Sequence, residues 1–334
     1  MAEMVQTDVL IIGAGLAGLN AARVLKDAGI AAVVVDKGTS VGGRMATRRI
    51  GGGLADHGAQ FFTVRDDTFR QMVDGWIASG LVFEWSRGWS DGSLADTRDG
   101  HPRYAVKSGM NALTKFLAQD LDTRVDVKVT AVTNSEVGWR VDDANGGVYH
   151  ARAVLLTSPV PQSLALLEAG HVNLTADDRN GLDEVEYEPC IVGLFLIDGE
   201  LHLPPPGAIQ RPHVPIQWLG DNRRKGISDV TVLTAQASSA YTHQMWDRAD
   251  AEILTAMRID IMPFLGEASV VDAQIKRWKY SMPSVLYPER CLFASGLTEP
   301  RILAFAGDAF GGPRVEGAVM SGLTAGRELV ARLK

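Results

Sequence analysis

The sequence predicts an α/β protein in which one domain, built around a parallel sheet, is interleaved with a second domain of antiparallel strands and helices. Residues 7–12 form a short apolar strand, followed by a glycine-rich turn, a helix and a second strand at 31–35. Residues 302–334 again have the order of strand, glycine-proline turn and helix. Tryptophan and proline concentrate at 65–104 and 161–289, where strand-like runs alternate in polarity. These two kinds of region predict two interwoven domains.

The composition is that of an ordered globular protein. With 334 residues, 46% hydrophobic and 22% charged, the chain is long enough for two domains with a substantial core. The net charge is −7 and the longest basic run is residues 223–225, so we expect no nucleic-acid partner. Cys190 and Cys291 stand apart in the sequence, which argues against a disulfide framework and favours a reducing compartment.

We do not expect the N-terminal apolar stretch to be a leader sequence. Residues 9–19 contain three glycines and follow Glu3 and Asp8 rather than basic residues. No apolar run is long enough to span a bilayer, and no HExxH or other metal-ligand spacing appears. We therefore expect a cytoplasmic protein, either a monomer or a homodimer, with no membrane partner and no metal.

The glycine turn carries the first chemical signal. Residues 13–18 (GAGLAG) form a GxGxxG pattern after a strand and before a helix, which is typical of dinucleotide binding. The first glycine permits a tight turn, the second lets the backbone approach a pyrophosphate, and the third lets the helix pack on the sheet. Asp36 ends the second strand, where it can accept hydrogen bonds from a ribose. The predicted contacts here are Gly13, Gly15, Leu16, Ala17, Gly18, Asp36 and Lys37. This unit suits NAD or FAD, and a purely structural turn is the alternative.

Two later segments indicate which dinucleotide is bound. Residues 41–45 (VGGRM) resemble the GGR segment of the flavin amine oxidase superfamily, where the arginine stands near the flavin pyrophosphate. Its glycines free backbone amides for phosphates, and Arg44 adds a fork-shaped cation, although a plain turn with a solvated arginine is the alternative. Residues 56–62 (DHGAQFF), together with residues 42–49 (GGRMATRR) and the C-terminal block, resemble the renalase-like branch of that superfamily.

The resemblance implies a Rossmann-type FAD-binding domain with a substrate domain of the amine-oxidase/p-hydroxybenzoate-hydroxylase kind. We expect the FAD-binding domain at residues 1–64, 105–160 and 290–334, and the substrate domain at 65–104 and 161–289. No family motif for covalent attachment appears, so we expect noncovalent FAD. The contacts that the resemblance implies are Gly43, Arg44, Met45, Gly58, Ala59, Gln60, Phe61, Val129, Thr157 and Pro159.

The C-terminal block is the second strong signal. A strand ends at Gly307 and Asp308, a Gly-Gly-Pro turn follows, and a helix is expected from about Val315. Asp308 can accept a hydrogen bond from a ribityl hydroxyl, and the helix N-terminus can stabilise negative charge on a reduced flavin. An ordinary small-residue packing helix is the alternative. The predicted contacts are Gly307, Asp308, Val315, Glu316 and Ala318.

The substrate side carries weaker signals. Residues 276–283 (KRWKYSMP) predict an alternating strand that resembles the family's RWRYxxP-like segment, from which Lys279 and Ser281 depart. Trp278 and Tyr280 share a face of this strand and can wall a pocket, with core packing as an equal alternative. The candidates for the pocket are Gln60, His57, Trp278 and Tyr280, followed by Trp85, Trp89, Tyr104, Trp218 and His243.

The resemblance implies an enzyme that oxidises a small molecule. In the renalase-like interpretation, a 2- or 6-dihydro isomer of NAD(P)H gives a hydride to flavin N5, and dioxygen takes the electrons to form hydrogen peroxide. Amine oxidation is the alternative, and a carotenoid-desaturase-like role is a third. From a different class, a non-catalytic FAD-binding or assembly protein stays open.

Overall fold

The structure is a computed structural model that describes residues 4–91, 98–211, 214–298 and 300–334. Residues 92–97, inside the expected substrate segment 65–104, lie outside the described residues. The chain divides into two compact units. Unit 1 comprises Met1–Gly43, Thr114–Glu186 and Pro283–Lys334, and unit 2 comprises Arg44–Leu113 and Tyr187–Met282.

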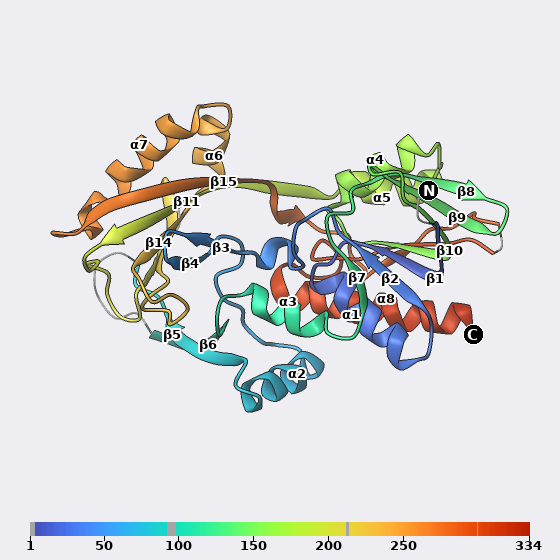
Figure 1. Ribbon diagram of the computed structural model, residues 1–334, viewed down its shortest axis with the longest axis horizontal. Coiled ribbons are helices and arrows are strands. Elements are labelled where there is room, and N and C mark those ends of the chain that lie inside the picture. The colour runs from blue at the N-terminus through green and yellow to red at the C-terminus, as the bar shows by residue number, and fades with distance from the viewer. Residues whose placement is uncertain (1–3, 92–97, 212–213, 299) are drawn as a thin grey trace. The chain divides into compact units, whose positions relative to one another are not determined.

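Unit 1 is built on a largely parallel sheet (Figure 1). Its strands are β1 (Met4–Ile12), β2 (Ala32–Val35), β7 (Asp122–Arg124), β8 (Val129–Ser135), β9 (Gly138–Asp143), β10 (Val148–Leu156), β16 (Leu292–Phe293) and β17 (Ile302–Phe305). Its helices are α1 (Leu16–Asp27), α4 (Val160–Ala169), α5 (Ala176–Asp183) and α8 (Arg314–Leu333). The sheet order is β16-β17-β10-β1-β2-β7, with β9 on β10 and β8 on β9.

The parallel pairings of unit 1 fix where its loops meet. β1 pairs in parallel with β2 and β10, and β10 pairs in parallel with β17. The carboxyl ends of these neighbouring strands therefore lie at one edge of the sheet, where ligands of open α/β sheets bind. The strand ends in question are Ile12, Val35, Leu156 and Phe305.

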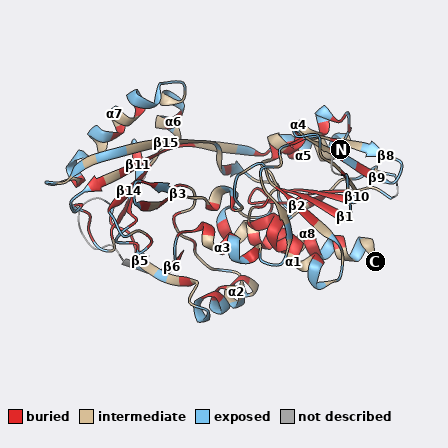
Figure 2. Cartoon of the chain, in the orientation of Figure 1, coloured by how far each residue is buried: buried red, intermediate tan, exposed pale blue. Residues whose placement is uncertain are grey.

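Helices α1 and α8 pack closely against each other (Figure 1). A Cβ built on Gly322 would collide with Ala17, and one on Gly326 would stand 2.9 Å from Val24 Cβ. Both helices and the central strands carry long buried stretches (Figure 2). The small residues of α8 therefore allow close packing on α1, as the alternative interpretation of this helix predicts. This packing does not decide what the N-terminus of α8 binds.

Unit 2 is built on an antiparallel sheet, ordered β12-β13-β14-β11-β15, with two hairpins and several helices. The sheet strands are β11 (Glu186–Asp198), β12 (Ala208–Gln210), β13 (Ile216–Asp221), β14 (Val232–Ala237) and β15 (Ser269–Val285). The hairpins are β3 (Thr47–Ile50) with β4 (Gly53–Asp56), and β5 (Val82–Gly88) with β6 (Arg98–Val106). The helices are α2 (Asp67–Ala78), α6 (Ser239–Met245) and α7 (Asp250–Ile261), and short turns of 3₁₀ helix occupy Gly43–Met45 and Met262–Phe264. Helix α3 (Asn111–Leu117) crosses the boundary between the units.

The interior strand β11, between β14 and β15, buries side chains on both of its faces, because successive side chains of a strand point to opposite sides. Ile191 and Phe195 belong to one core with Met257 of α7. Val192 and Leu194 belong to another core with Ile50 of the β3–β4 hairpin. The sheet of unit 2 is therefore covered by helix α7 on one face and by the hairpin on the other.

Candidate active site

The glycine turn after β1 is crowded at two of its glycines and open at the third. Gly13 has a φ of +118°, and a Cβ there would collide with Thr157 Oγ1. A Cβ on Gly18 would collide with the Gly13 carbonyl oxygen. Gly15 differs, because no described heavy atom lies within 4 Å of a Cβ built on it. The turn is thus crowded on its protein side and open at the one glycine expected to face a pyrophosphate.

The N-terminus of α1 adds donors to that open space. Gly15 is its N-cap residue, no described side chain caps it, and no acidic residue stands in the first turn. Leu16 and Ala17 begin the helix, so their amides point out of its N-terminus. Uncapped amides and the positive end of the helix dipole suit an anion. These residues fit the pyrophosphate of a dinucleotide.

Asp36 fastens the turn to the end of β2. Its Oδ2 accepts from the Ala14 amide at 2.7 Å, and its Oδ1 accepts from the Gly38 amide at 2.7 Å. Each oxygen retains a second lone pair, so the carboxylate can still accept from a ribose. The predicted contact Lys37 instead donates from Nζ to Gln162 Oε1 at 2.9 Å. The Asp126 amide donates to the Gly38 carbonyl, and the Val127 amide donates to the Asp36 carbonyl. The predicted contact Val129 follows two residues later and is 9% exposed.

The other predicted segments of unit 1 also meet this edge of the sheet. Thr157 Oγ1 donates to the carbonyl oxygens of Ile12 and Gly13, both at 3.0 Å, and Pro159 is the N-cap residue of α4. The Gly42 amide donates to the Ala14 carbonyl at 2.9 Å. Gly43 has a φ of +52°, and a Cβ built on it would lie 3.8 Å from the Gly15 Cα. The GGR segment is thus joined to the phosphate turn.

The C-terminal block ends at the same edge. Gly307 has a φ of +152° and donates its amide to the buried Ser321 Oγ at 2.8 Å, while Asp308 is 9% exposed. Helix α8 begins at Arg314 with Pro313 as N-cap residue, and no described side chain caps it. Its first residues include the predicted contacts Val315, Glu316 and Ala318. The Gly307 turn thus packs on α8, whose first turn carries one acidic residue, Glu316.

Close contacts within unit 2 fix the position of the segment Asp56–Gln60. A Cβ on Gly58 would collide with the Arg44 carbonyl, to which the Ala59 amide donates at 2.9 Å. Gln60 is 5% exposed, and its Nε2 donates to the Asp56 carbonyl at 2.7 Å. Met45, which follows Arg44, is buried. Gly58 therefore has no room for a side chain, because the Arg44 backbone lies where a Cβ would stand.

A set of aromatic and cationic side chains lies beside that segment, and we call it the cationic aromatic wall. The His57 imidazole stacks on the Trp278 indole with centroids 5.4 Å apart, and Trp278 Nε1 donates to the His57 carbonyl at 2.8 Å. Tyr280 meets Tyr187 edge to face at 5.4 Å. The members of the wall are His57, Tyr187, Trp278 and Tyr280, with the cations Arg44, Arg48, Lys276 and Lys279.

The cations lie close to the rings. Lys276 Nζ is 5.2 Å from the Trp278 ring centroid, Lys279 Nζ is 5.5 Å from that of Tyr280, and Arg44 Cζ is 6.0 Å from that of Tyr187. Burial of the His57 imidazole, with Lys276 and Arg48 adding positive charge, lowers its pKa to about 4. His57 is therefore neutral at pH 7, and the fixed charges of the wall are positive.

The remaining aromatic candidates form a separate cluster. Trp89 and Trp218 have centroids 5.0 Å apart, Trp85 lies 4.7 Å from Trp89, and the Phe61 ring packs on Trp89 at 5.0 Å. The structure thus brings the predicted cofactor contact Phe61 together with three candidate tryptophans. Of the other two candidates, Tyr104 stacks on Phe62 with ring centroids 5.7 Å apart, and His243 is exposed on α6.

A buried ion pair beside the Asp56–Gln60 segment was missed by the sequence analysis. Lys225 Nζ lies 2.6 Å from Asp56 Oδ2 and 2.6 Å from the Gln60 carbonyl oxygen, and both side chains are at most 1% exposed. Lys225 closes the basic run at residues 223–225, which by itself suggests an exposed surface. Its pairing spans 169 residues, so no local pattern predicts it.

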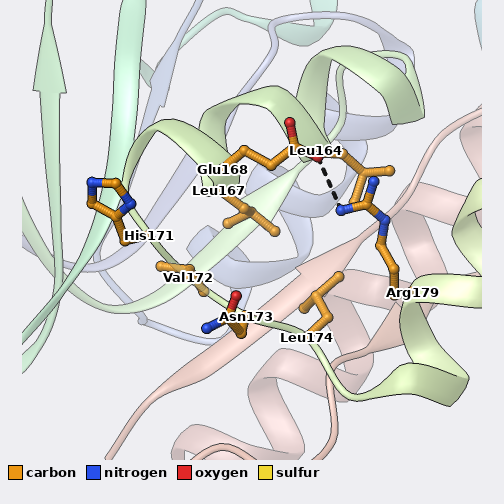
Figure 3. A pocket seen from close by; sticks show the side chains of 8 residues that line it. All are labelled: Leu164, Leu167, Glu168, His171, Val172, Asn173, Leu174 and Arg179. Atoms are coloured by element: carbon orange, nitrogen blue, oxygen red, sulfur yellow. Dashed lines mark hydrogen bonds and ion pairs between the residues drawn. The ribbon is translucent and has the colours of Figure 1, made fainter.

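Two cavities among the described residues have linings that contain none of the predicted cofactor contacts. One, of about 360 Å³, lies between α4, α5 and the linker at residues 171–174, with Arg179 paired to Glu168 at 2.9 Å across its rim (Figure 3). The other, of about 580 Å³, is in unit 2 and is lined by Phe83, Glu84, Trp85, Leu203, Pro205, Pro206, Arg224 and Lys225.

The described residues contain neither a metal-binding group of side chains nor a membrane-spanning helix. Within them, no group of three or more His, Cys, Asp or Glu side chains is arranged to hold a metal ion. Over the same ranges, no helix is long and apolar enough to cross a membrane.

Known proteins resemble this chain in both sequence and fold. Residues 11–76 match the family described as NAD(P)-binding Rossmann-like domain, and residues 77–330 match flavin containing amine oxidoreductase. The FAD-dependent monooxygenase adaC of Aspergillus niger is 26% identical over 212 residues, which cover 59% of this chain and 46% of that protein. The chain thus spans about half the length of the curated relative.

Two solved oxidases share the fold. A putrescine oxidase variant has a TM-score of 0.74 at 16% identity, covering 98% of this chain and 100% of the other. Cyclohexylamine oxidase from Brevibacterium oxydans IH-35A has a TM-score of 0.73 at 13% identity, covering 98% and 99%. They confirm the predicted α/β class, a Rossmann-like FAD-binding domain with an antiparallel-sheet substrate domain. Because the match at residues 77–330 spans more than half of the chain, the protein belongs to the flavin containing amine oxidoreductase family, an enzyme family that implies FAD as cofactor.

Proposed function

We propose that the chain is an FAD-dependent oxidase of the renalase-like branch, which takes a hydride from a 2- or 6-dihydro isomer of NAD(P)H. The observation that carries this proposal is the charge of the cationic aromatic wall. Its rings offer flat surfaces for stacking a nicotinamide or adenine, and Lys276 and Lys279 lie within 5.5 Å of those rings. Permanent positive charge beside aromatic faces attracts a planar substrate that carries phosphates.

The proposed cofactor site uses the residues of unit 1 that fit a dinucleotide. The open turn at Gly15 and the α1 N-terminus hold the pyrophosphate, and Asp36 holds a ribose. The N-terminus of α8 faces the pyrimidine side of the flavin ring. In this proposal unit 1 supplies the contacts to the pyrophosphate and to the ribose.

Residues Gly58, Ala59 and Gln60 lie along the flavin ring in this proposal. They follow from the resemblance, and the structure supports it through one connection. Gly58 and Ala59 contact the carbonyl of Arg44, and Arg44 follows Gly43 of the phosphate turn directly in the chain. We also propose that FAD is noncovalently bound.

The chain's own residues have little chemistry to perform in this reaction. FAD, when bound, supplies the hydride acceptor and the path of both electrons to dioxygen. Loss of one hydride turns a dihydropyridine into an aromatic pyridinium, so no side chain has to remove a proton from it. One dihydro isomer, one dioxygen and one proton give NAD(P)⁺ and hydrogen peroxide. His57, kept neutral by burial, adds no charge against the cationic product ring.

Amine oxidation is the second candidate, and the comparisons favour it more directly. The family is named for amine oxidoreductases, and both solved structures named above are amine oxidases by name. Hydride loss from an amine needs the neutral form, whereas an aliphatic amine at pH 7 is mostly a cation. The fixed positive charges of the wall oppose such a cation and lower its pKa on binding.

Anaerobic stopped-flow reduction separates these candidates. The holoenzyme is mixed with 2- and 6-dihydro-NAD(P), with ordinary NADH and NADPH, and with a panel of mono- and diamines, and flavin absorbance is followed. We expect rapid bleaching by the dihydro isomers and little by the other compounds. Bleaching by amines alone establishes the second candidate. A flavin that stays oxidised with every compound contradicts both and favours a non-catalytic FAD-binding protein.

A further inference from the structure

Two cations of the cationic aromatic wall border the layer between the β3–β4 hairpin and the unit 2 sheet. Arg48 stands opposite Ala55 in the hairpin register, so the two side chains share a face. Ala55 belongs to the core on which Trp278 packs. Lys276 stands two residues before Trp278 on β15, so it shares the face of that indole, and its Nζ lies 5.2 Å from the ring centroid. Strands β3 and β15 thus bring Arg48 and Lys276 to one layer of unit 2.

The His57 imidazole lies between these two cations and the indole. Its ring stacks on Trp278 with centroids 5.4 Å apart. Burial, and then the charges of Lys276 and Arg48, lower its pKa to about 4. Both cations are therefore close enough to act on the same ring. Because that ring is neutral at pH 7, the charge gathered here is that of the two cations alone.

No carboxylate neutralises either cation among the residues that the structure describes. Lys276 contacts an aromatic ring instead, and Arg48 is exposed. Their neighbours differ, because Arg277 on the opposite face of β15 pairs with Asp250. Like charges that converge without a counter-charge repel each other. An anion from outside the chain relieves this repulsion.

A phosphomonoester beside a flat ring fits this arrangement. At pH 7 a phosphomonoester carries a charge of about −1.5 to −2, which matches two cations, whereas each phosphate of a pyrophosphate bridge carries about −1. The Trp278 ring next to Lys276 offers a surface on which a base can stack. Among the substrates considered above, the dihydro-NADP isomers carry a phosphomonoester on the adenosine ribose, and the dihydro-NAD isomers do not.

We propose that Arg48 and Lys276 form a subsite for the 2′-phosphate of an NADP-type ligand, so that the chain prefers NADP-type over NAD-type ligands. Every residue of this subsite belongs to unit 2. The inference rests on the proposed function in one respect, that the ligand is a nicotinamide dinucleotide. It involves no step of flavin reduction.

The test is calorimetric titration of the oxidised holoenzyme with NADP⁺ and with NAD⁺, at low ionic strength because salt screens exposed charges. The two probes differ only in the 2′-phosphate, so the ratio of their dissociation constants isolates that group from stacking and from general damage to the fold. Arg48→Met is compared with Arg49→Met, since Arg49 stands opposite Leu54 on the other face of the hairpin. Lys276→Met is compared with Lys276→Arg, which keeps the charge.

We expect the wild type to bind NADP⁺ at least about tenfold more tightly than NAD⁺. Arg48→Met and Lys276→Met should each reduce this ratio to about threefold or less. Arg49→Met and Lys276→Arg should keep the wild-type ratio. Equal affinities of the wild type for the two probes, or no binding of NADP⁺, overturn the inference. So does an equal loss of the ratio in Arg48→Met and Arg49→Met, because the effect is then one of overall charge.

Two features keep the test decisive. The two cations stand on different strands, so if one methionine variant does not fold, the other variant and its control still give the answer. Both probes are already oxidised, so their binding does not depend on turnover. Failure of the dihydronicotinamide proposal appears in the stopped-flow panel, and failure of the subsite appears in the ratio of dissociation constants.

Discussion

The Trp278 indole holds His57 in two ways at once: its ring stacks on the imidazole at 5.4 Å with an angle of 20° between the planes, and its Nε1 donates to the His57 carbonyl at 2.8 Å. The pair fixes the segment that the proposed function places along the flavin ring. Its ring and its N–H can be removed separately.

Replacing Trp278 by Phe keeps an aromatic face and removes the donor. The His57 carbonyl then loses its partner, so we expect the free energy of unfolding in urea to fall by about 1–2 kcal/mol. The matched control is Tyr280→Phe on the same strand face, which loses only a hydroxyl group. Equal unfolding free energies for the two variants would show that the bond to His57 contributes nothing.

The His57 imidazole makes stability depend on pH in a definite direction. Its pKa is about 4 in the folded chain and 6.5 when exposed, so the unfolded chain binds more protons between these values. The neutral imidazole's contribution to the free energy of unfolding is fully present above pH 6.5 and is lost as the pH falls from about 6.5 to about 4. The loss is about 3 kcal/mol for a shift of this size.

The measurement is urea unfolding at pH 7 and pH 5 for the wild type and two variants. His57→Gln should flatten the pH dependence, while His243→Gln, which alters an exposed residue of α6, should leave it unchanged. A wild-type slope that survives His57→Gln would assign the dependence to other groups.

Gly15 and Gly322 separate cofactor binding from folding. A Cβ on Gly15 meets no described atom and enters the space proposed for the pyrophosphate, whereas a Cβ on Gly322 collides with Ala17. We expect Gly15→Ala to weaken FAD binding at least tenfold, about 1.4 kcal/mol, with little change in apoprotein melting temperature. Gly322→Ala should lower the melting temperature of the apoprotein itself. Fluorescence titration and apoprotein melting give both readouts, and unchanged FAD affinity in Gly15→Ala would remove the pyrophosphate from this turn.

Acid precipitation tests how FAD is held. We expect all flavin in the supernatant, because binding depends on backbone amides, glycine turns and hydrogen bonds that are lost on unfolding. Flavin fixed to the protein pellet would show a covalent bond.

Short-range residue patterns were enough to predict some of the secondary-structure elements. The GxGxxG turn, the strands beside it and the start of α8 follow from glycine spacing and apolar periodicity, and the α/β class with an antiparallel second domain is confirmed. The role of Thr157 beneath Gly13 did not follow, because the two residues meet only when β10 pairs with β1. The roles of the individual site residues stay predictions.

The sequence did not show which charged side chains are buried or which lie against aromatic rings. Lys225 lies in a basic run, and only the folded sheet shows that it is buried against Asp56. Lys279 was a departure from the family segment, and the proximity of Lys276 and Lys279 to the Trp278 and Tyr280 rings appeared only in the structure. Strand alternation predicts which side chains share a face but not which charges gather beside it.

The most direct test of the central claim is the anaerobic rate of flavin bleaching by 6-dihydro-NAD beside that by ordinary NADH and by putrescine, measured with one holoenzyme preparation at pH 7.5. The account predicts that the 6-dihydro isomer bleaches the flavin at least a hundredfold faster than either comparison compound, with NAD⁺ as the product. Faster bleaching by putrescine, or no bleaching by the isomer, would contradict it.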